Sequence, residues 1–172
     1  MSLFRITWTK VVVLALAIAV VATGSIAFTS TGTAPEVVDV GIASEAVTAN
    51  QIRPGACSAL TLTGILSGSS VTGTSAGELI WGTDGTDTLA GGAGGDCIVG
   101  GAGTGDSLAG DAGNDVLIGG PGASLSGGAG DDTLIDSSPN AVFDGGDGSD
   151  TCIGDPSATY DPSCETVRNI GS

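Results

Sequence analysis

Basic residues are nearly missing from this chain, and their absence excludes several functions. The 172 residues include four Lys and Arg, no His, and 19 Asp and Glu. No basic residue lies between Pro54 and Val167, although 16 of the 19 acids fall in that stretch. Nucleic-acid binding needs a basic surface, so no nucleic-acid partner is expected. The lack of His excludes Ser/His/Asp catalysis.

Large side chains are scarce as well. Aromatic residues make up 3% of the sequence, while 31 residues are glycine. Such a chain cannot build a globular core from large side chains, so we expect repetition, with each unit burying a small apolar face on the next. The length favours one folded domain.

Residues 1–27 have the pattern of an export signal. A positively charged start precedes an unbroken apolar run over 11–22, and small residues precede Phe28. An uncleaved membrane anchor is the alternative, but the run is shorter than the roughly 20 apolar residues of a spanning helix. We expect cleavage near Ala27 and a secreted or cell-surface protein, with membrane attachment if the signal stays uncleaved.

A nine-residue unit of form G-G-x-G-x-D-x-U-x, with U apolar, recurs between residues 64 and 153. The copies that fit well begin at Gly91, Gly110, Gly127 and Gly145. Weaker copies fill the intervals, with one extra residue in 100–109 and one fewer in 119–126. Apolar residues thus keep their phase through the acidic stretch, which a disordered linker does not require.

The unit predicts a tight turn followed by a short strand. Glycine permits the positive φ angles of the turn, and the x-U-x triplet has strand character. Turn plus strand reverses the chain, so two units make a coil of about eighteen residues and alternate units stack on one edge. Carbonyl and carboxylate oxygens then converge between stacked turns. This donor set suits Ca²⁺ better than Mg²⁺, which demands stricter octahedral geometry.

These units resemble the haemolysin-type calcium-binding repeats of the repeats-in-toxin (RTX) family, well over residues 73–153 and faintly over 64–72. The resemblance implies an all-β fold, a parallel β-roll solenoid with two repeats per coil. It also implies that the sixth residue of each matching unit binds Ca²⁺, namely Asp87, Asp96, Asp106, Asp115, Asp132 and Asp150. Glu78 holds that place in an earlier unit. The cysteines and the N-terminal signal depart from much of the family and argue against a pore-forming toxin.

Alternate stacking predicts two unequal edges. The first edge is complete and carries Glu78, Asp96, Asp115, Asp132 and Asp150. The second edge carries Asp87 and Asp106, but Ser124 and Ala141 stand where further acids are expected. We expect three ions between neighbouring acids from Asp96 to Asp150, a weaker one near Glu78, and at most one on the second edge. The total is about three to five Ca²⁺.

Four cysteines agree with export, because disulfides persist in oxidising compartments. They allow three pairings. We favour Cys57–Cys97 and Cys152–Cys164, one bridge near each end of the repeat array. A zinc site is the alternative, but the chain has neither a C-x-x-C pair nor His. The resulting organisation is a signal over 1–27, a linker or N-terminal cap over 28–56, the calcium-binding roll over 57–153, and a C-terminal cap over 154–172.

One outer face of the roll is predicted to carry an apolar ladder that consists of Val99, Ile118, Ile135 and Ile153. Cys97 points to the same face, so its bridge to Cys57 would bring nearby apolar residues over the ladder. We favour cover by Leu60, Leu62, Ile65 or Leu66. The alternative is docking of a protein or cell-surface partner.

The sequence therefore predicts an exported calcium-binding β-roll with a structural, adhesive or interaction role, and no enzyme activity. Without Ca²⁺ the uncompensated carboxylates oppose compaction, so folding should be stabilised by the ion. One alternative is a catalytic solenoid that uses a pair of carboxylates. Another is an ice- or surface-binding solenoid, which needs a regular rank of Thr that the outward positions do not supply.

Overall fold

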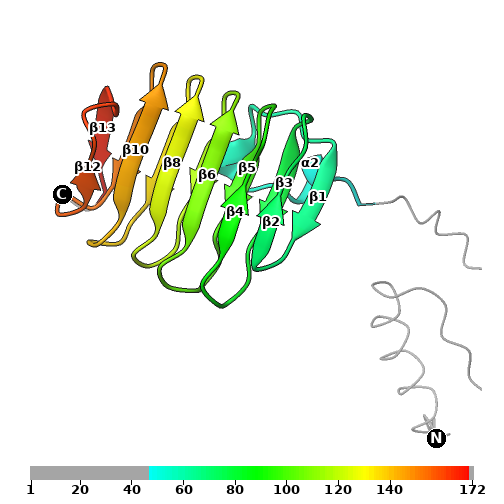
Figure 1. The fold of residues 1–172 in the computed structure, drawn as a ribbon, viewed down its shortest axis with the longest axis horizontal. Coiled ribbons are helices and arrows are strands. Elements are labelled where there is room, and N and C mark those ends of the chain that lie inside the picture. The colour runs from blue at the N-terminus through cyan, green and yellow to red at the C-terminus, as the bar shows by residue number, and fades with distance from the viewer. Residues whose placement is uncertain (1–46, 171–172) are drawn as a thin grey trace, which may run out of the picture. The chain divides into compact units, whose positions relative to one another are not determined.

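The computed structural model describes residues 47–170, which wind as two facing parallel sheets (Figure 1). The seven-stranded sheet has the order β1-β3-β5-β7-β9-β11-β13, and the six-stranded sheet has the order β12-β10-β8-β6-β4-β2. Each coil thus adds one strand to each sheet. The parallel β-roll predicted from the nine-residue units is confirmed.

The strands of the seven-stranded sheet are β1 (Gly64–Ser67), β3 (Glu78–Trp81), β5 (Cys97–Val99), β7 (Val116–Ile118), β9 (Thr133–Asp136), β11 (Thr151–Gly154) and β13 (Thr166–Asn169). Those of the six-stranded sheet are β2 (Ser70–Thr72), β4 (Thr88–Ala90), β6 (Ser107–Ala112), β8 (Ser124–Ala129), β10 (Val142–Asp147) and β12 (Thr159–Tyr160). The chain before them forms α2 (Ala49–Ile52) and the 3₁₀ helix η2 (Gly55–Cys57). Strands β6, β8 and β10 run beyond the expected triplet into the following glycine turn.

The apolar place of each unit points into the space between the sheets. Its side chains are at most 1% exposed and comprise Ile80, Leu89, Ile98, Leu108, Leu117, Leu125, Leu134, Phe143 and Cys152. Burying one large aliphatic side chain contributes roughly 1.5–3 kcal/mol before the entropy of ordering is counted. A single file of such side chains holds the two sheets together, so the interior is thin.

Both sheets continue past Ile153, where the nine-residue units stop. Strand β12 pairs with β10, and β13 pairs with β11. The ring of Tyr160 stacks on that of Phe143, with centroids 4.9 Å apart, and its hydroxyl donates a hydrogen bond to the carbonyl of Asp155. The last coil is therefore closed by aromatic packing as well as by strand pairing.

The segment before β1 covers part of the seven-stranded sheet. Ala49, Cys57 and Leu62 are buried against outward side chains of that sheet, including Val99 and Val116. Asn50 donates to the Leu62 carbonyl and accepts from the Leu62 amide. The chain's own segment before β1 therefore covers this part of the sheet, as predicted from the sequence.

The cover is partial and comes from a subset of the residues expected. Leu60 packs against the same cluster as Leu62, and so do the half-buried Ile118 and Ile135 of the apolar ladder. Ile65 is instead 45% exposed, and Leu66 packs against the interior core. The ladder is therefore not a free docking face near Val99, which is 9% exposed.

Disulfides join Cys57 to Cys97 and Cys152 to Cys164, with Cα atoms 5.9 and 5.8 Å apart. These are the pairs favoured from the sequence. The predicted export signal, and the part of the predicted linker before Val47, lie outside the described residues. Between residues 47 and 170, helices are too short and too polar to cross a membrane.

Candidate metal centre

Acidic side chains form a hydrogen-bonded ladder along the first edge, where each even-numbered strand turns into the next odd-numbered strand. The backbone N–H of one acid donates to Oδ1 of the acid one coil further on. These bonds run from Glu78 to Asp96 (2.7 Å), Asp96 to Asp115 (2.7 Å), Asp115 to Asp132 (2.8 Å) and Asp132 to Asp150 (2.8 Å). The partners are 17 to 19 residues apart, so the extra and the missing residue are absorbed without loss of register.

The other oxygen of each aspartate has a different environment. Six Oδ2 atoms are buried and have no hydrogen-bond partner among residues 47–170. We call them the open oxygens, and they belong to Asp96, Asp106, Asp115, Asp132, Asp136 and Asp150. The six side chains that carry them are at most 3% exposed. A buried carboxylate oxygen left unpaired is costly, so this arrangement calls for a cation or a proton.

Glycine at the first place of each unit lets oxygens converge. A Cβ built on Gly110 would lie 2.4 Å from Asp115 Oδ2 and 2.4 Å from the Gly127 carbonyl oxygen. A Cβ on Gly127 would meet Asp132 Oδ2 and the Gly145 carbonyl at the same distances. The open oxygen of one coil therefore lies beside a carbonyl oxygen of the next, in a place that no side chain can enter.

Burial changes the proton affinity of these carboxyl groups. Removal from water raises the pKa of Asp115 to about 7 and those of Asp96 and Asp132 to about 6, from the usual 3.8. The negative charges of neighbouring acids add to the rise, and the hydrogen bond received from the preceding coil opposes it. The pKa of Asp150 is raised for the same reason. Without a cation, the ladder therefore competes for protons near neutral pH.

These donors fit Ca²⁺. The ion takes six to eight oxygen ligands from carboxylates and backbone carbonyls in flexible geometry. Over residues 47–170, no three Asp, Glu, His or Cys side chains come together in one cluster. A site here must accordingly use one or two carboxylates and complete its shell with carbonyls, as the converging oxygens near Gly110 and Gly127 allow.

Two of the predicted ligands are already satisfied within their own turns. Asp87 accepts from the Thr83 amide (2.8 Å) and from the Thr83 hydroxyl (2.7 Å). Glu78 accepts from the Thr74 amide (3.1 Å) and from the Thr74 hydroxyl (2.5 Å). Both acids are buried in the predicted places, yet neither has an open oxygen. The donor chemistry near these two acids does not call for an ion.

The residue at the second place of the unit explains this difference. Gly92, Gly128 and Gly146 adopt positive φ there, at 93°, 108° and 98°, and Asp111 does so at 70°. A β-branched Thr strongly disfavours positive φ. Thr therefore gives a different turn, in which its amide and hydroxyl cap the acid. This second place was the sequence signal that separates capped acids from those with open oxygens.

Asp136 is the functional candidate that the sequence interpretation missed. It occupies the first place of its unit, normally glycine, and is 3% exposed at the end of β9. A Cβ built on Gly119, one coil earlier, would lie 2.6 Å from Asp136 Oδ2. The second edge, where Ser124 replaces the expected acid, therefore carries a buried carboxylate from the next coil. The sequence signal for such a residue is an acid at the first position of a unit, where glycine is usual, when the preceding unit on the same edge lacks its own acid.

The second edge also brings oxygens together beside Asp106. The amide of Asp87 donates to Asp106 Oδ1 (2.9 Å), which leaves Asp106 Oδ2 open. A Cβ on Gly120 would lie 2.7 Å from the Gly101 carbonyl oxygen and 3.4 Å from Asp106 Oδ2. This edge thus has two open oxygens, those of Asp106 and Asp136, in turns two coils apart.

The fold and the two acid ladders define a cation-binding parallel β-roll. Residues 72–105, 104–123 and 126–156 match the RTX calcium-binding nonapeptide repeat, in four copies. This part of the chain therefore belongs to the RTX nonapeptide-repeat family. No curated protein and no solved structure matches the chain.

Proposed function

We propose that this chain is an exported protein whose roll is stabilised by Ca²⁺ and that serves a structural or adhesive role outside the cell. One observation carries the proposal. Six buried carboxylate oxygens are open, in a stretch of sequence that holds no basic residue to neutralise them. Bound Ca²⁺ would supply the missing positive charge and join successive coils.

The proposed ligands are the six aspartates with open oxygens, together with carbonyl oxygens of the stacked glycine turns. The first edge contributes Asp96, Asp115, Asp132 and Asp150. The second edge contributes Asp106 and Asp136. We leave out Glu78 and Asp87, because Thr74 and Thr83 already satisfy them. About three to five ions remain the expected total, with affinities of roughly 10⁻⁴–10⁻³ M, the range of extracellular modules.

Export is supported by the disulfides and by the signal-like N-terminal sequence. The chain pairs all four of its cysteines in disulfides, which persist in oxidising compartments. The signal-like pattern over 1–27 agrees with this location. Millimolar Ca²⁺ outside the cell would keep sites of the proposed affinity filled, whereas cytosolic levels would not.

A structural role is favoured over catalysis. The chain has no His, and eight of its carboxylates are buried in the turns of the roll. The RTX repeats themselves are calcium-binding structural units. A partner would meet the surface left uncovered on the seven-stranded sheet, of which the half-buried Ile153 is part.

Far-UV circular dichroism of the oxidised protein, titrated with CaCl₂ and separately with MgCl₂, tests the proposal. We expect β-signal or thermal stability to rise with Ca²⁺ at sub-millimolar to millimolar levels and to respond much less to Mg²⁺. Metal analysis of the protein as purified identifies ions already bound. No bound Ca²⁺ and no response to added Ca²⁺ would contradict the proposal.

A further inference from the structure

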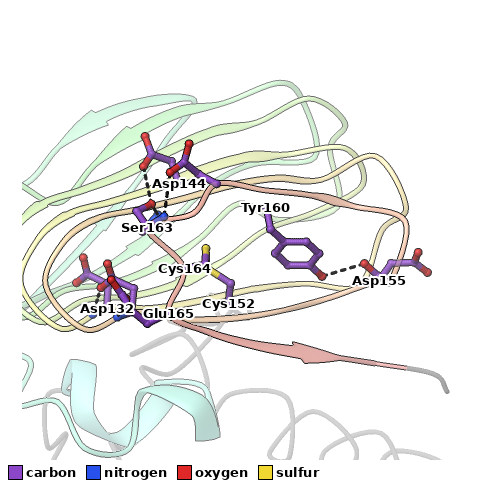
Figure 2. The surroundings of a disulfide bond; sticks show 11 residues. Asp132, Asp144, Cys152, Asp155, Tyr160, Ser163, Cys164 and Glu165 are labelled. Carbon is purple, nitrogen blue, oxygen red and sulfur yellow. Dashed lines mark hydrogen bonds between the residues drawn. A yellow bond between two sulfur atoms is a disulfide. The ribbon is translucent and has the colours of Figure 1, made fainter.

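The carboxylate ladder of the first edge does not end with the nonapeptide units. The backbone N–H of Asp150 donates to Glu165 Oε2 over 2.7 Å, as each earlier acid does to the acid one coil on. Glu165 lies nine residues beyond the last residue matched to the RTX repeat. Figure 2 shows Glu165 at this end of the roll, near the Cys152–Cys164 disulfide. The chain thus supplies one more acid at the sixth first-edge turn, between β12 and β13.

Ser163 replaces the first glycine of that turn. A Cβ on Gly145 would lie 2.5 Å from Asp150 Oδ2 and 2.6 Å from the Ser163 carbonyl oxygen. The same position on Gly127 meets Asp132 Oδ2 and the Gly145 carbonyl at 2.4 Å each. Ser163 also accepts the Gly145 amide on Oγ at 2.8 Å, which fixes it against the preceding coil. A carboxylate oxygen and a carbonyl oxygen therefore come together here as they do in the regular units, although this turn is not a nine-residue unit.

A disulfide stands where the glycine turn is missing. Four residues lie between the first glycine and the acid in a regular unit such as Gly145–Asp150, but Cys164 alone lies between Ser163 and Glu165. Cys164 is bonded to Cys152, which occupies the apolar place inside the roll (Figure 2). The disulfide holds Ser163 and Glu165 against the last coil. In the regular units, backbone hydrogen bonds between stacked glycine turns hold the corresponding residues.

Asp150 provides independent evidence that this place requires a ligand. Its side chain is 1% exposed, and its Oδ2 is one of the open oxygens. Asp150 Oδ2 points to the glycine beside which the Ser163 carbonyl lies. Glu165 is exposed and its Oε2 accepts the Asp150 amide, so its carboxylate lies next to Asp150 on the solvent side.

We propose that Asp150, the Ser163 carbonyl and Glu165 form one further Ca²⁺ site at the C-terminal end, and that the Cys152–Cys164 disulfide holds its donors in place. The site rests on the proposed function, since it uses the same ion. It differs from the nonapeptide sites because its outer wall is a cross-linked cap rather than a glycine turn. Reduction of this disulfide should release the terminal ion and leave the others bound.

The first test counts Ca²⁺ by equilibrium dialysis and calorimetry for the oxidised wild-type protein and for Glu165→Gln. Gln keeps an oxygen to accept the Asp150 amide but removes the charge. The matched control is Asp155→Asn, which removes one half-buried charge from the same end, where the Asp155 side chain bonds only Ser157 among the described residues. We expect Glu165→Gln to bind one ion fewer and Asp155→Asn to bind as many as wild type.

An unchanged count and affinity in Glu165→Gln would overturn the terminal site while leaving the proposed function intact. A wild-type protein that binds no Ca²⁺ would instead overturn the proposed function. The second test asks whether the disulfide acts through the same site, using Cys152→Ala/Cys164→Ala with and without Glu165→Gln. We expect the cysteine variant to lose the same single ion and the combined variant to lose no more. An undiminished count in the cysteine variant, or an additional ion lost in the combined one, would refute the role given to the disulfide.

Discussion

Asp115 is bonded to the coil before it through one oxygen and is open at the other. Its Oδ1 accepts the Asp96 amide at 2.7 Å, while its buried Oδ2 has no hydrogen-bond partner within residues 47–170. The first contact holds the coils in register. The open oxygen carries a negative charge that no nearby group in the described chain neutralises. We therefore expect stability and cation binding to be coupled at a single side chain.

Asp115→Asn should weaken calcium binding and lower the stability of the calcium-loaded roll. Asn retains an oxygen for the Asp96 amide but no negative charge. An ion present at 100 times its Kd stabilises the fold by about 2.7 kcal/mol, so losing one such site lowers the unfolding free energy by roughly that amount. Calorimetric titration and chemical unfolding in Ca²⁺ measure both effects.

Asp87→Asn is the matched control for that change. Asp87 is as deeply buried as Asp115 and occupies the same place in its unit, but Thr83 already bonds both its oxygens. We expect this variant to keep its full number of ions and to lose about 1–3 kcal/mol, because one buried bond is broken. Equal loss of ions in Asp87→Asn and Asp115→Asn would refute the distinction between capped and open acids.

The metal-free protein should be more stable in mild acid than at neutral pH. In the folded roll the pKa of Asp115 is about 7 and those of Asp96 and Asp132 are about 6, all above the usual 3.8 of an exposed carboxyl. The folded state thus binds more protons than the unfolded state between those values. Its stability must then fall as pH rises from about 4 to about 7.

Thermal unfolding at pH 5 and pH 7.5 in metal-free buffer checks this sign. Calcium binding should show the opposite trend, with affinity rising over the same interval, because the ion displaces protons. Greater stability at pH 7.5 than at pH 5 without metal would contradict the prediction.

The repeat pattern is sufficient to predict the roll, its core and the two edges. The apolar place fixes which side chain enters the interior, and the period of about eighteen residues fixes which acids stack. The 19- and 17-residue steps around Asp115 follow from one inserted and one deleted residue that are visible in the sequence. These features depend on local spacing, which a sequence displays directly.

Three acids depart from the roles predicted by the repeat pattern. The causes are contacts between coils and residue types within a turn that the nine-residue consensus does not specify. Thr83 satisfies Asp87 because a β-branched residue disfavours the positive φ of the regular turn. Asp136 reaches back to Gly119 across 17 residues, outside its expected place. Glu165 continues the ladder after the repeat has ended. Each involves an acid that spacing alone assigns to the wrong role or to none.

Asp136→Asn should remove calcium binding on the second edge. The variant keeps an oxygen for the Ser138 amide, which Asp136 Oδ1 accepts at 2.7 Å, so the turn after β9 should persist. The charge that faces Gly119 is lost, and we expect the total number of ions to fall by one. Asp144→Asn on the neighbouring strand, whose side chain is exposed, is the control and should bind as wild type. An unchanged count in Asp136→Asn would show that this edge relies on Asp106 without it.

Gly110→Ala should abolish binding at the centre of the first edge. Its φ is not in the left-handed region, so any effect comes from the new methyl group, which would lie 2.4 Å from Asp115 Oδ2 and from the Gly127 carbonyl. These are the oxygens that we propose bind the ion, and they must move apart to admit a carbon atom. We expect a loss of about 1–3 kcal/mol from overpacking and at least one ion fewer.

Gly105→Ala separates this effect from backbone strain. Gly105 has φ of 73° but open space around it, so the cost should be about 1–2 kcal/mol with no oxygen displaced. Its calcium count should equal that of wild type, measured by the same dialysis as for Gly110→Ala. If both variants lost the same number of ions, calcium binding would follow the overall stability of the roll. The convergence of oxygens at the first glycine would then not be what forms the site.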